Sequence, residues 1–106
     1  MVKLVVLYKK PEDPKAFDER YFGQHMPIAN KMPGVRKVEI SKITGTPMGE
    51  SEYYLLTELY FDTMEALKES MGSPEGKATA KDVMSFAKDI IYMMIADVQE
   101  KVPAAV

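Results

Sequence analysis

Apolar residues follow two different periods along the chain, and the change of period separates predicted strands from predicted helices. Residues 2–8 are rich in β-branched and aromatic side chains, as strands are, and they end at the turn-forming KKPEDP segment. From Pro14 onward the apolar residues recur every three or four positions, which predicts one face of a helix. These positions are Phe17, Tyr21, His25, Ile28 and Met32. Pro33 and Gly34 are expected to end this helix, because the residue before a proline avoids the helical conformation and glycine accepts a positive φ.

The middle of the chain predicts two more strands and a short helix. Residues 35–44 alternate as a strand does, a loop follows, and residues 53–61 form the next strand. Asp62 is the predicted N-cap of the short helix, and Glu65 stands at the spacing of a capping box. Its predicted buried edge consists of Met64, Leu67 and Met71.

A further helix and a final strand complete the pattern. Ser73 is the predicted N-cap of this helix, with Pro74 at its first position. Its predicted buried stripe consists of Ala80, Val83, Met84 and Ala87. Residues 90–98 are expected to form the last strand. The order β-α-β-β-α-β predicts a single α+β domain over residues 1–99, with a ferredoxin-like, four-stranded antiparallel sheet and a frayed tail at 100–106.

Three predicted strands carry apolar residues on both faces, whereas the helices can cover only one face. In residues 53–61, for example, one face would hold Tyr53, Leu55, Leu59 and Phe61, and the other Tyr54, Leu56 and Tyr60. An exposed apolar face of this size exceeds what monomers usually tolerate. We therefore expect a homodimer that pairs sheet against sheet. A ligand or partner-protein groove on the open sheet is the alternative.

Composition narrows the range of functions. The chain has 106 residues, 46% hydrophobic and 28% charged, with a net charge of −2 and scattered basic residues. This is the composition of one globular domain, without the cationic face that nucleic acid requires. It has no cysteine and no apolar run long enough to span a bilayer, so we expect a cytoplasmic protein with neither thiolate chemistry nor a membrane partner.

The only histidine, His25, is the main candidate for chemistry. Helical projection points its ring toward the sheet, beside Tyr21. Gly23 and Pro27 both weaken the helix around it, and a bend with a small cavity is expected there. The ring would then be either a buried, neutral residue that hydrogen-bonds a partner, or a general acid or base.

Polar residues within apolar strands are the candidate partners of this histidine. Tyr21 lies one turn earlier on the same helix face, and Glu58, Thr57 and Asp97 interrupt the predicted strands. The proposed site residues are therefore His25, Tyr21 and Glu58, although Glu58 and Asp97 could equally lie at strand ends or in ion pairs. With one histidine and no cysteine we expect no metal site of the zinc or non-haem iron kind, and an all-carboxylate site is the alternative. With no glycine-rich phosphate loop we expect no nucleotide cofactor.

These residues carry a resemblance to a known family. The segments MVKLVVLYKKPEDPKAFDERYF, YYLLTELYFDTMEAL and SPEG resemble those of the EthD family, a branch of the dimeric α+β barrel superfamily. The His25-Met26-Pro27 triplet followed by Pro33-Gly34 is the most specific part of this resemblance, which extends from about Val2 to Val98.

The resemblance implies a dimeric α+β barrel that holds a small apolar or aromatic ligand between sheet and helices, with His25 as its polar contact. It implies a cofactor-independent enzyme, or an accessory protein, in the oxidative catabolism of a small aromatic, lactone-like or ether compound. Such an enzyme would be a monooxygenase-like or reductase-like oxidoreductase, or an isomerase. The alternatives are a non-catalytic carrier of a hydrophobic metabolite and a dimer with no pocket.

Overall fold

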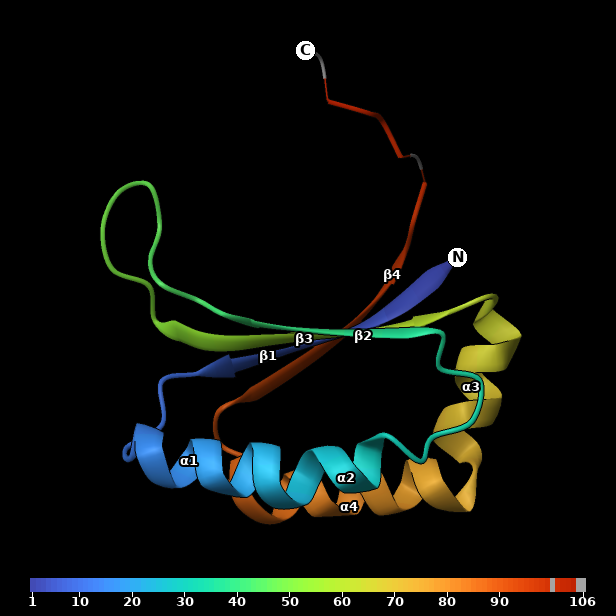
Figure 1. The fold of residues 1–106 in the computed structure, drawn as a ribbon, viewed down its shortest axis with the longest axis horizontal. Coiled ribbons are helices and arrows are strands. Elements are labelled where there is room, and N and C mark those ends of the chain that lie inside the picture. Colours follow the sequence, from blue (N-terminus) through green and yellow to red (C-terminus); the bar gives the residue numbers. More distant parts are fainter. Residues whose placement is uncertain (100, 105–106) are drawn as a thin grey trace.

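The chain forms one antiparallel sheet with a layer of helices on one side (Figure 1). A computed structural model describes residues 1–99 and 101–104. The elements are β1 (Val2–Lys9), α1 (Pro14–Arg20), the π-helical turn η1 (Tyr21–His25), α2 (Met26–Ala29), β2 (Lys37–Lys42), β3 (Tyr53–Phe61), α3 (Met64–Gly72), α4 (Pro74–Ala87) and β4 (Ile91–Asp97). The strand order is β2-β3-β1-β4, and every neighbouring pair is antiparallel. The predicted ferredoxin-like α+β fold is confirmed.

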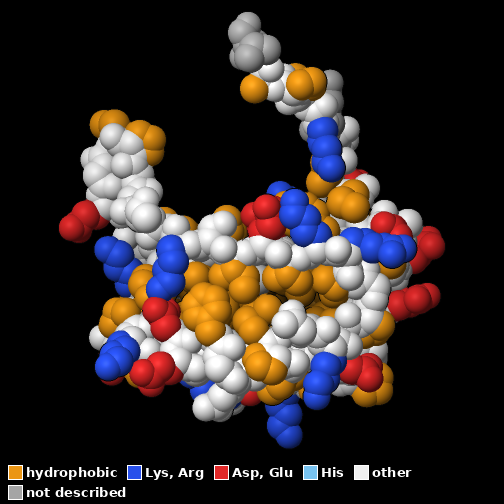
Figure 2. All heavy atoms as spheres, viewed as in Figure 1, with side chains coloured by type: hydrophobic (Ala, Val, Ile, Leu, Met, Phe, Trp, Pro, Cys, Tyr) orange, Lys and Arg blue, Asp and Glu red, His pale blue; other side chains and the backbone are white. Residues whose placement is uncertain are grey.

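The core lies between the sheet and the helix layer. Alternate residues of β1 and β3 point into it, and among the most enclosed are Tyr8, Leu55 and Phe61. Phe17 and Tyr21 reach the same core from the helices, with ring centroids 5.7 Å apart in a stacked arrangement. In the view of Figure 2, hydrophobic side chains gather in a band between sheet and helices, and charged side chains lie around it.

The first long helix changes its hydrogen-bond pattern at η1, between α1 and α2. The Met26 N–H donates to the carbonyl of Tyr21, five residues earlier. Pro27 has no N–H, and its ring would clash with the carbonyl of Gly23 in a regular α-helix, so a wider turn accommodates it. The predicted irregularity near Gly23 and Pro27 is thus a π-helical turn, and His25 is its last residue.

One strand departs from strict alternation. The register between β1 and β3 shifts at Tyr8 and Lys9, which is the signature of a β-bulge. As a result Tyr54 contacts the helix side: its hydroxyl donates to Asp18 at 2.8 Å, and its ring packs edge-on against Phe17. The prediction that Tyr54 shares a face with Leu56 and Tyr60 was therefore wrong.

The predicted N-cap residue is confirmed for α4 and wrong for α3. Ser73 caps α4 by accepting from the Gly76 N–H, as predicted. For α3 the cap is Thr63, whose hydroxyl accepts from the Ala66 N–H. Asp62 instead pairs with Arg36, at 2.6 and 2.9 Å. Three members of the two predicted buried stripes are exposed instead: Met71, Ala80 and Met84.

Helices α3 and α4 approach each other closely at Gly76. A β-carbon at this position would lie 2.0 Å from the carbonyl oxygen of Ser70 and 2.8 Å from Met71 Cα. Because both contacts are backbone atoms, only glycine fits here without displacing a helix. This contact fixes where α4 lies relative to α3.

The face of the sheet opposite the helices is open. Its central residues are apolar: Leu7 of β1 lies between Leu56 of β3 and Tyr92 of β4. Two features extend away from the helix layer on this side, the loop of residues 43–52 and residues 101–104 (Figure 1). Residues 101–104 form no helix or strand, and the remainder of the predicted frayed tail, residues 100 and 105–106, lies outside the described residues.

The two edges of the sheet differ in character. Edge strand β2 carries Lys37, Glu39 and Lys42, and most of its residues are exposed. Edge strand β4 has no charged residue from Ile91 to Ala96, and its four central residues are all exposed. One edge is therefore charged and the other apolar.

Candidate functional site

A cavity of about 80 Å³ lies between the sheet and the helix layer. Its wall is almost entirely apolar, with side chains from β1, β3, β4 and all helical segments except α1. Four methionines contribute to it: Met26, Met32, Met71 and Met93. The polar side chains on the wall are those of Tyr8, Tyr21, His25, Thr57 and Thr79.

His25 reaches this cavity from the last position of η1. Its side chain is buried, with 5% of the residue exposed. The ring lies 5.6 Å from that of Tyr21 and edge-on to Phe86 at 5.5 Å. The structure thus places both Tyr21 and His25 at the cavity, as the helical projection predicted.

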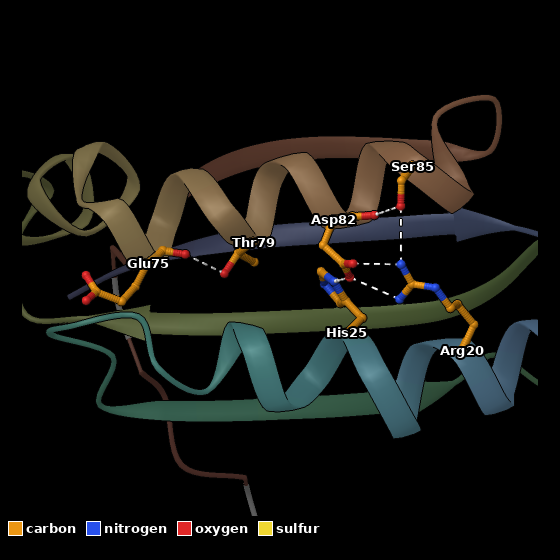
Figure 3. Close-up of polar contacts among 6 residues, drawn as sticks. All are labelled: Arg20, His25, Glu75, Thr79, Asp82 and Ser85. Carbon is orange, nitrogen blue, oxygen red and sulfur yellow. Dashed lines mark hydrogen bonds and ion pairs between the residues drawn. The ribbon is translucent and has the colours of Figure 1, made fainter.

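The carboxylate partner of His25 is Asp82 of α4. Its Oδ2 lies 2.8 Å from His25 Nδ1. The same carboxylate accepts two hydrogen bonds from the Arg20 guanidinium, at 2.6 and 3.1 Å. Figure 3 shows Arg20 and His25 pointing from one helical segment toward Asp82 on the facing helix.

This environment keeps His25 uncharged and Asp82 ionised near neutral pH. Burial lowers the pKa of His25 below 6.5; Asp82 opposes this shift and Arg20 adds to it. The hydrogen bonds from Arg20 lower the pKa of Asp82, and the contact with His25 lowers it further. The pair is therefore a neutral imidazole that donates Nδ1–H to a carboxylate.

Tyr21 and Thr57 form a second polar group on the wall. Their hydroxyls hydrogen-bond each other, and both residues are buried. Burial raises the pKa of Tyr21 to about 12, although the bond to Thr57 opposes the shift. Tyr21 thus remains protonated and can act as a hydrogen-bond donor.

Comparison with known proteins identifies the family. The model of the EthD domain matches residues 9–90. The chain belongs to the EthD family. A crystal structure of an EthD-family protein from Bacillus halodurans C-125 is 47% identical with a TM-score of 0.91, covering 93% of this chain and 99% of that one. An uncharacterised 11.0 kDa protein from Rhodococcus erythropolis is 31% identical over 103 residues, covering 97% of this chain and all of the relative.

More distant structures share the fold of this EthD protein. SnoaB from Streptomyces nogalater, a cofactor-independent oxygenase crystallised as a mutant, is 11% identical with a TM-score of 0.70, covering 97% of both chains. A dimeric ferredoxin-like protein of unknown function from Jannaschia sp. CCS1 is 16% identical with a TM-score of 0.68, covering 92% of this chain and all of that one. At such identities the similarity shows the fold alone.

The structure does not bring two of the candidate partners in this EthD chain, Glu58 and Asp97, to His25. Glu58 lies on the open face of the sheet, where its carboxylate binds Lys3 at 2.7 Å. Its neighbours Thr57 and Leu59 point into the core, and successive residues of a strand face opposite sides. Asp97 is exposed at the end of β4. The predicted grouping of Glu58 with His25 and Tyr21 is therefore corrected, because the sheet separates Glu58 from the other two.

The sequence carries one signal that points to Asp82. Asp82 follows Thr79 by three positions and precedes Phe86 by four, so all three share one side of α4. All three lie at the edge of the buried stripe and are half-buried. Arg20, the last residue of α1, is also half-buried and directly precedes Tyr21.

Two absences apply to the described part of the EthD chain. Within residues 1–99 and 101–104, no helix has both the length and the apolar character needed to cross a membrane. In the same residues, no three histidine or acidic side chains lie close enough together to hold a metal ion.

The direction of the His25 pKa shift predicts how stability depends on pH. Because the folded-state pKa lies below the unfolded value of 6.5, the unfolded chain binds this proton more tightly. The free energy of unfolding should therefore fall as pH decreases through about 6.5 and level off below the folded pKa. The lowered pKa of Asp82 makes its own contribution, which is present above 3.8 and lost as pH falls through the folded value.

Urea denaturation at intervals between about pH 8 and pH 5 would measure this dependence. His25→Gln carries no titrating ring, so its stability should change less over this interval than that of the parent chain. A parent and a variant with parallel profiles would show that His25 titrates in the folded state as it does in the unfolded chain.

Proposed function

We propose that this EthD-family protein is a cofactor-independent enzyme, or an accessory protein of an oxidative catabolic pathway, that acts on a small aromatic, lactone-like or ether compound. In this proposal His25 transfers a proton and Tyr21 donates a hydrogen bond. The observation that carries it is a buried imidazole bound to Asp82 on the wall of an almost entirely apolar cavity. A titratable group held in such a cavity is a candidate for general acid–base catalysis.

The wall of the cavity favours an uncharged ligand. No lysine, arginine or carboxylate among the described residues lines it, so a charged compound would lose its hydration without gaining a partner. Its volume of about 80 Å³ is smaller than the roughly 150 Å³ that accommodates benzene in a protein core. A ring compound would therefore displace side chains, and Met71 and Met93 are suited to this because they are flexible and partly exposed.

The reaction would begin with transfer of a proton from the substrate to His25. An O–H or C–H bond breaks, an N–H bond forms on the imidazole, and the substrate retains the electron pair. Tyr21 would stabilise the resulting oxyanion by donating its hydroxyl hydrogen. Return of the proton to another atom gives an isomerisation, and reaction of the electron-rich anion with dioxygen gives an oxygenation; neither route needs a nucleotide. SnoaB, on the same fold, is a cofactor-independent oxygenase.

The test uses turnover of a substrate found by screening phenols, quinones and lactones. His25→Gln preserves the size and polarity of the side chain but cannot accept a proton, so kcat should fall by roughly 10²-fold to 10⁴-fold. Gln24→Ala, at the exposed neighbouring position, is the matched control and should retain activity. Full turnover in His25→Gln would contradict proton transfer by this residue.

A non-catalytic carrier is the second candidate, favoured by the almost wholly apolar wall of the cavity. A carrier would bind a hydrophobic metabolite tightly and yield no product. Calorimetry alongside product analysis separates the two functions. Under the carrier hypothesis, His25→Gln should weaken binding without changing the chemical identity of the bound compound.

We further propose a homodimer formed through the open face of the sheet. The charged groups there are paired within one protomer, as in Lys3 with Glu58 and Lys37 with Glu39. The net charge of these two pairs is zero, so a second copy can cover the face without leaving an unpaired charge. The loop of residues 43–52 extends from the same side, and its Met48 is 96% exposed. The Jannaschia protein with this fold is dimeric.

A further inference from the structure

We propose that Asp82, itself held by Arg20, is the positioning residue that keeps the imidazole proton of His25 on Nδ1, so that Nε2 is the basic atom available to the cavity. This inference rests on the proposed role of His25. It adds to that role two residues that do not line the cavity, and it specifies the nitrogen that would accept the proton.

The hydrogen-bonding capacity of Asp82 determines the tautomer. An ionised carboxylate can only accept hydrogen bonds. Its Oδ2 lies 2.8 Å from His25 Nδ1, so Nδ1 must carry the hydrogen in this contact. Because the neutral imidazole has a single N–H, Nε2 then carries a lone pair. Arg20 lowers the pKa of Asp82, which keeps the carboxylate ionised near neutral pH.

Arg20 restricts the carboxylate to one orientation. Its Nη2 donates to Oδ1 at 2.6 Å and its Nη1 donates to Oδ2 at 3.1 Å, a fork that fixes the plane of the carboxylate. The guanidinium also donates to Ser85 Oγ at 3.2 Å and lies over the Phe86 ring, 4.5 Å from its centroid. Figure 3 shows Ser85 and Asp82 along the same side of α4, with Arg20 facing both.

Nothing described in the protein occupies Nε2. Among residues 1–99 and 101–104, the hydrogen bond of the His25 ring is the one from Nδ1 to Asp82, and His25 lines the cavity. Three other polar groups on the wall make hydrogen bonds within the protein, and none of these bonds is to His25. Tyr21 and Thr57 bind each other, and Thr79 donates to the carbonyl of Glu75.

The two charged neighbours have opposite effects on the imidazole. Asp82 raises the pKa of His25, whereas Arg20 lowers it. The other titratable groups packed near the ring or on the same wall are Tyr8 of β1 and Tyr21 of η1, and burial raises the pKa of both phenols, which leaves them neutral. Removing Asp82 should therefore lower the pKa of His25, and removing Arg20 should raise it.

The experiment is ¹⁵N NMR of the imidazole in the ligand-free protein, where a single histidine makes the assignment unambiguous. In the parent chain at neutral pH, Nδ1 should show the shift of a protonated ring nitrogen and Nε2 that of an unprotonated one. A parent protein with the proton on Nε2 overturns the proposal without any variant.

Asp82→Asn tests the cause of this tautomer. An asparagine that turns its NH₂ toward the ring donates to Nδ1, so the proton should move to Nε2 in a substantial fraction of molecules. Asp62→Asn is the matched control, because Asp62 is likewise paired with an arginine, Arg36, and makes no contact with His25. Nitrogen shifts in Asp82→Asn that equal those of the parent and the control overturn the proposal.

The imidazole C–H titration provides the second readout. Asp82→Asn should move the titration to lower pH, and Arg20→Gln should move it to higher pH. If the two substitutions only loosened the packing around His25, both titrations would move toward 6.5, the value of an exposed ring. That result would overturn the proposal. Neither measurement uses substrate. Positioning by Asp82 can therefore hold even if His25→Gln retains full turnover, in which case only the proposed function fails.

Discussion

Replacing Gly76 with alanine is expected to lower the free energy of unfolding by about 3 kcal/mol, at the upper end of the cost of overpacking. The added methyl group would collide with the backbone of Ser70 and Met71, and backbone atoms cannot rotate away as a side chain can. Helix α4 must therefore shift or tilt relative to α3. Urea denaturation of parent and variant measures the effect.

Gly72→Ala is the control for this prediction, because nothing lies within 4 Å of a β-carbon at Gly72. Alanine has a higher helix propensity than glycine, so this variant should be as stable as the parent or slightly more stable. Equal stabilities for the two alanine variants would show that α4 adjusts to the methyl group at no cost. If α4 does shift, Asp82 shifts with it, and the His25 NMR signals should change in Gly76→Ala alone.

Placing a lysine at Leu7 is expected to convert the proposed homodimer to monomers. Leu7 lies at the centre of the open face, between Leu56 and Tyr92. In a symmetric interface the change occurs twice, and an unpaired buried charge costs on the order of 2–5 kcal/mol each time. The dimer dissociation constant should then rise by at least roughly 10³-fold. Light scattering across a concentration series measures the mass.

Met84→Lys is the matched control for this substitution. Met84 is an exposed apolar residue of α4, on the helix layer and away from the open face, so its replacement should leave the mass unchanged. A monomeric parent chain would rule out the homodimer directly. A Leu7→Lys variant that stays dimeric would place the interface elsewhere on the surface.

The sequence predicted the fold well because its main signals are local. The period of the apolar residues distinguishes a strand such as β3 from a helix such as α4, and cap residues such as Ser73 mark where helices begin. Errors arose where two nearby residues could serve the same purpose. Asp62 and Thr63 are both acceptable N-caps, and the choice depended on Arg36, which lies far away in the sequence and binds Asp62.

Alternation failed at a bulge for a related reason. The side on which Tyr54 lies depends on a register shift between β1 and β3, and on the contact of its hydroxyl with Asp18. Both partners are remote in sequence. No periodic pattern within the strand itself contains that information.

The candidate site was only half predictable. His25 and Tyr21 lie one helical turn apart, so a projection of one segment places them together. Asp82 is 57 positions away from His25, on a helix whose placement depends on packing against α3, α2 and η1. Glu58 was predicted as a site residue because it interrupts an apolar strand. It directly follows Thr57 in β3, and successive residues of a strand point to opposite faces, so Glu58 lies on the open face.

The contrast between the two edge strands gives the sheet a direction of growth. Unpaired backbone groups at an edge can accept another strand, and charged side chains discourage this. At β2 the alternation of Lys37 and Glu39 means that an incoming strand would need to match these charges. At β4 an incoming strand would meet only uncharged side chains from Ile91 to Ala96, with Asp97 at the end of the strand. A sheet that continues into a neighbouring molecule, in an ordered assembly or in an aggregate, should therefore do so through β4, with β2 remaining its outer boundary.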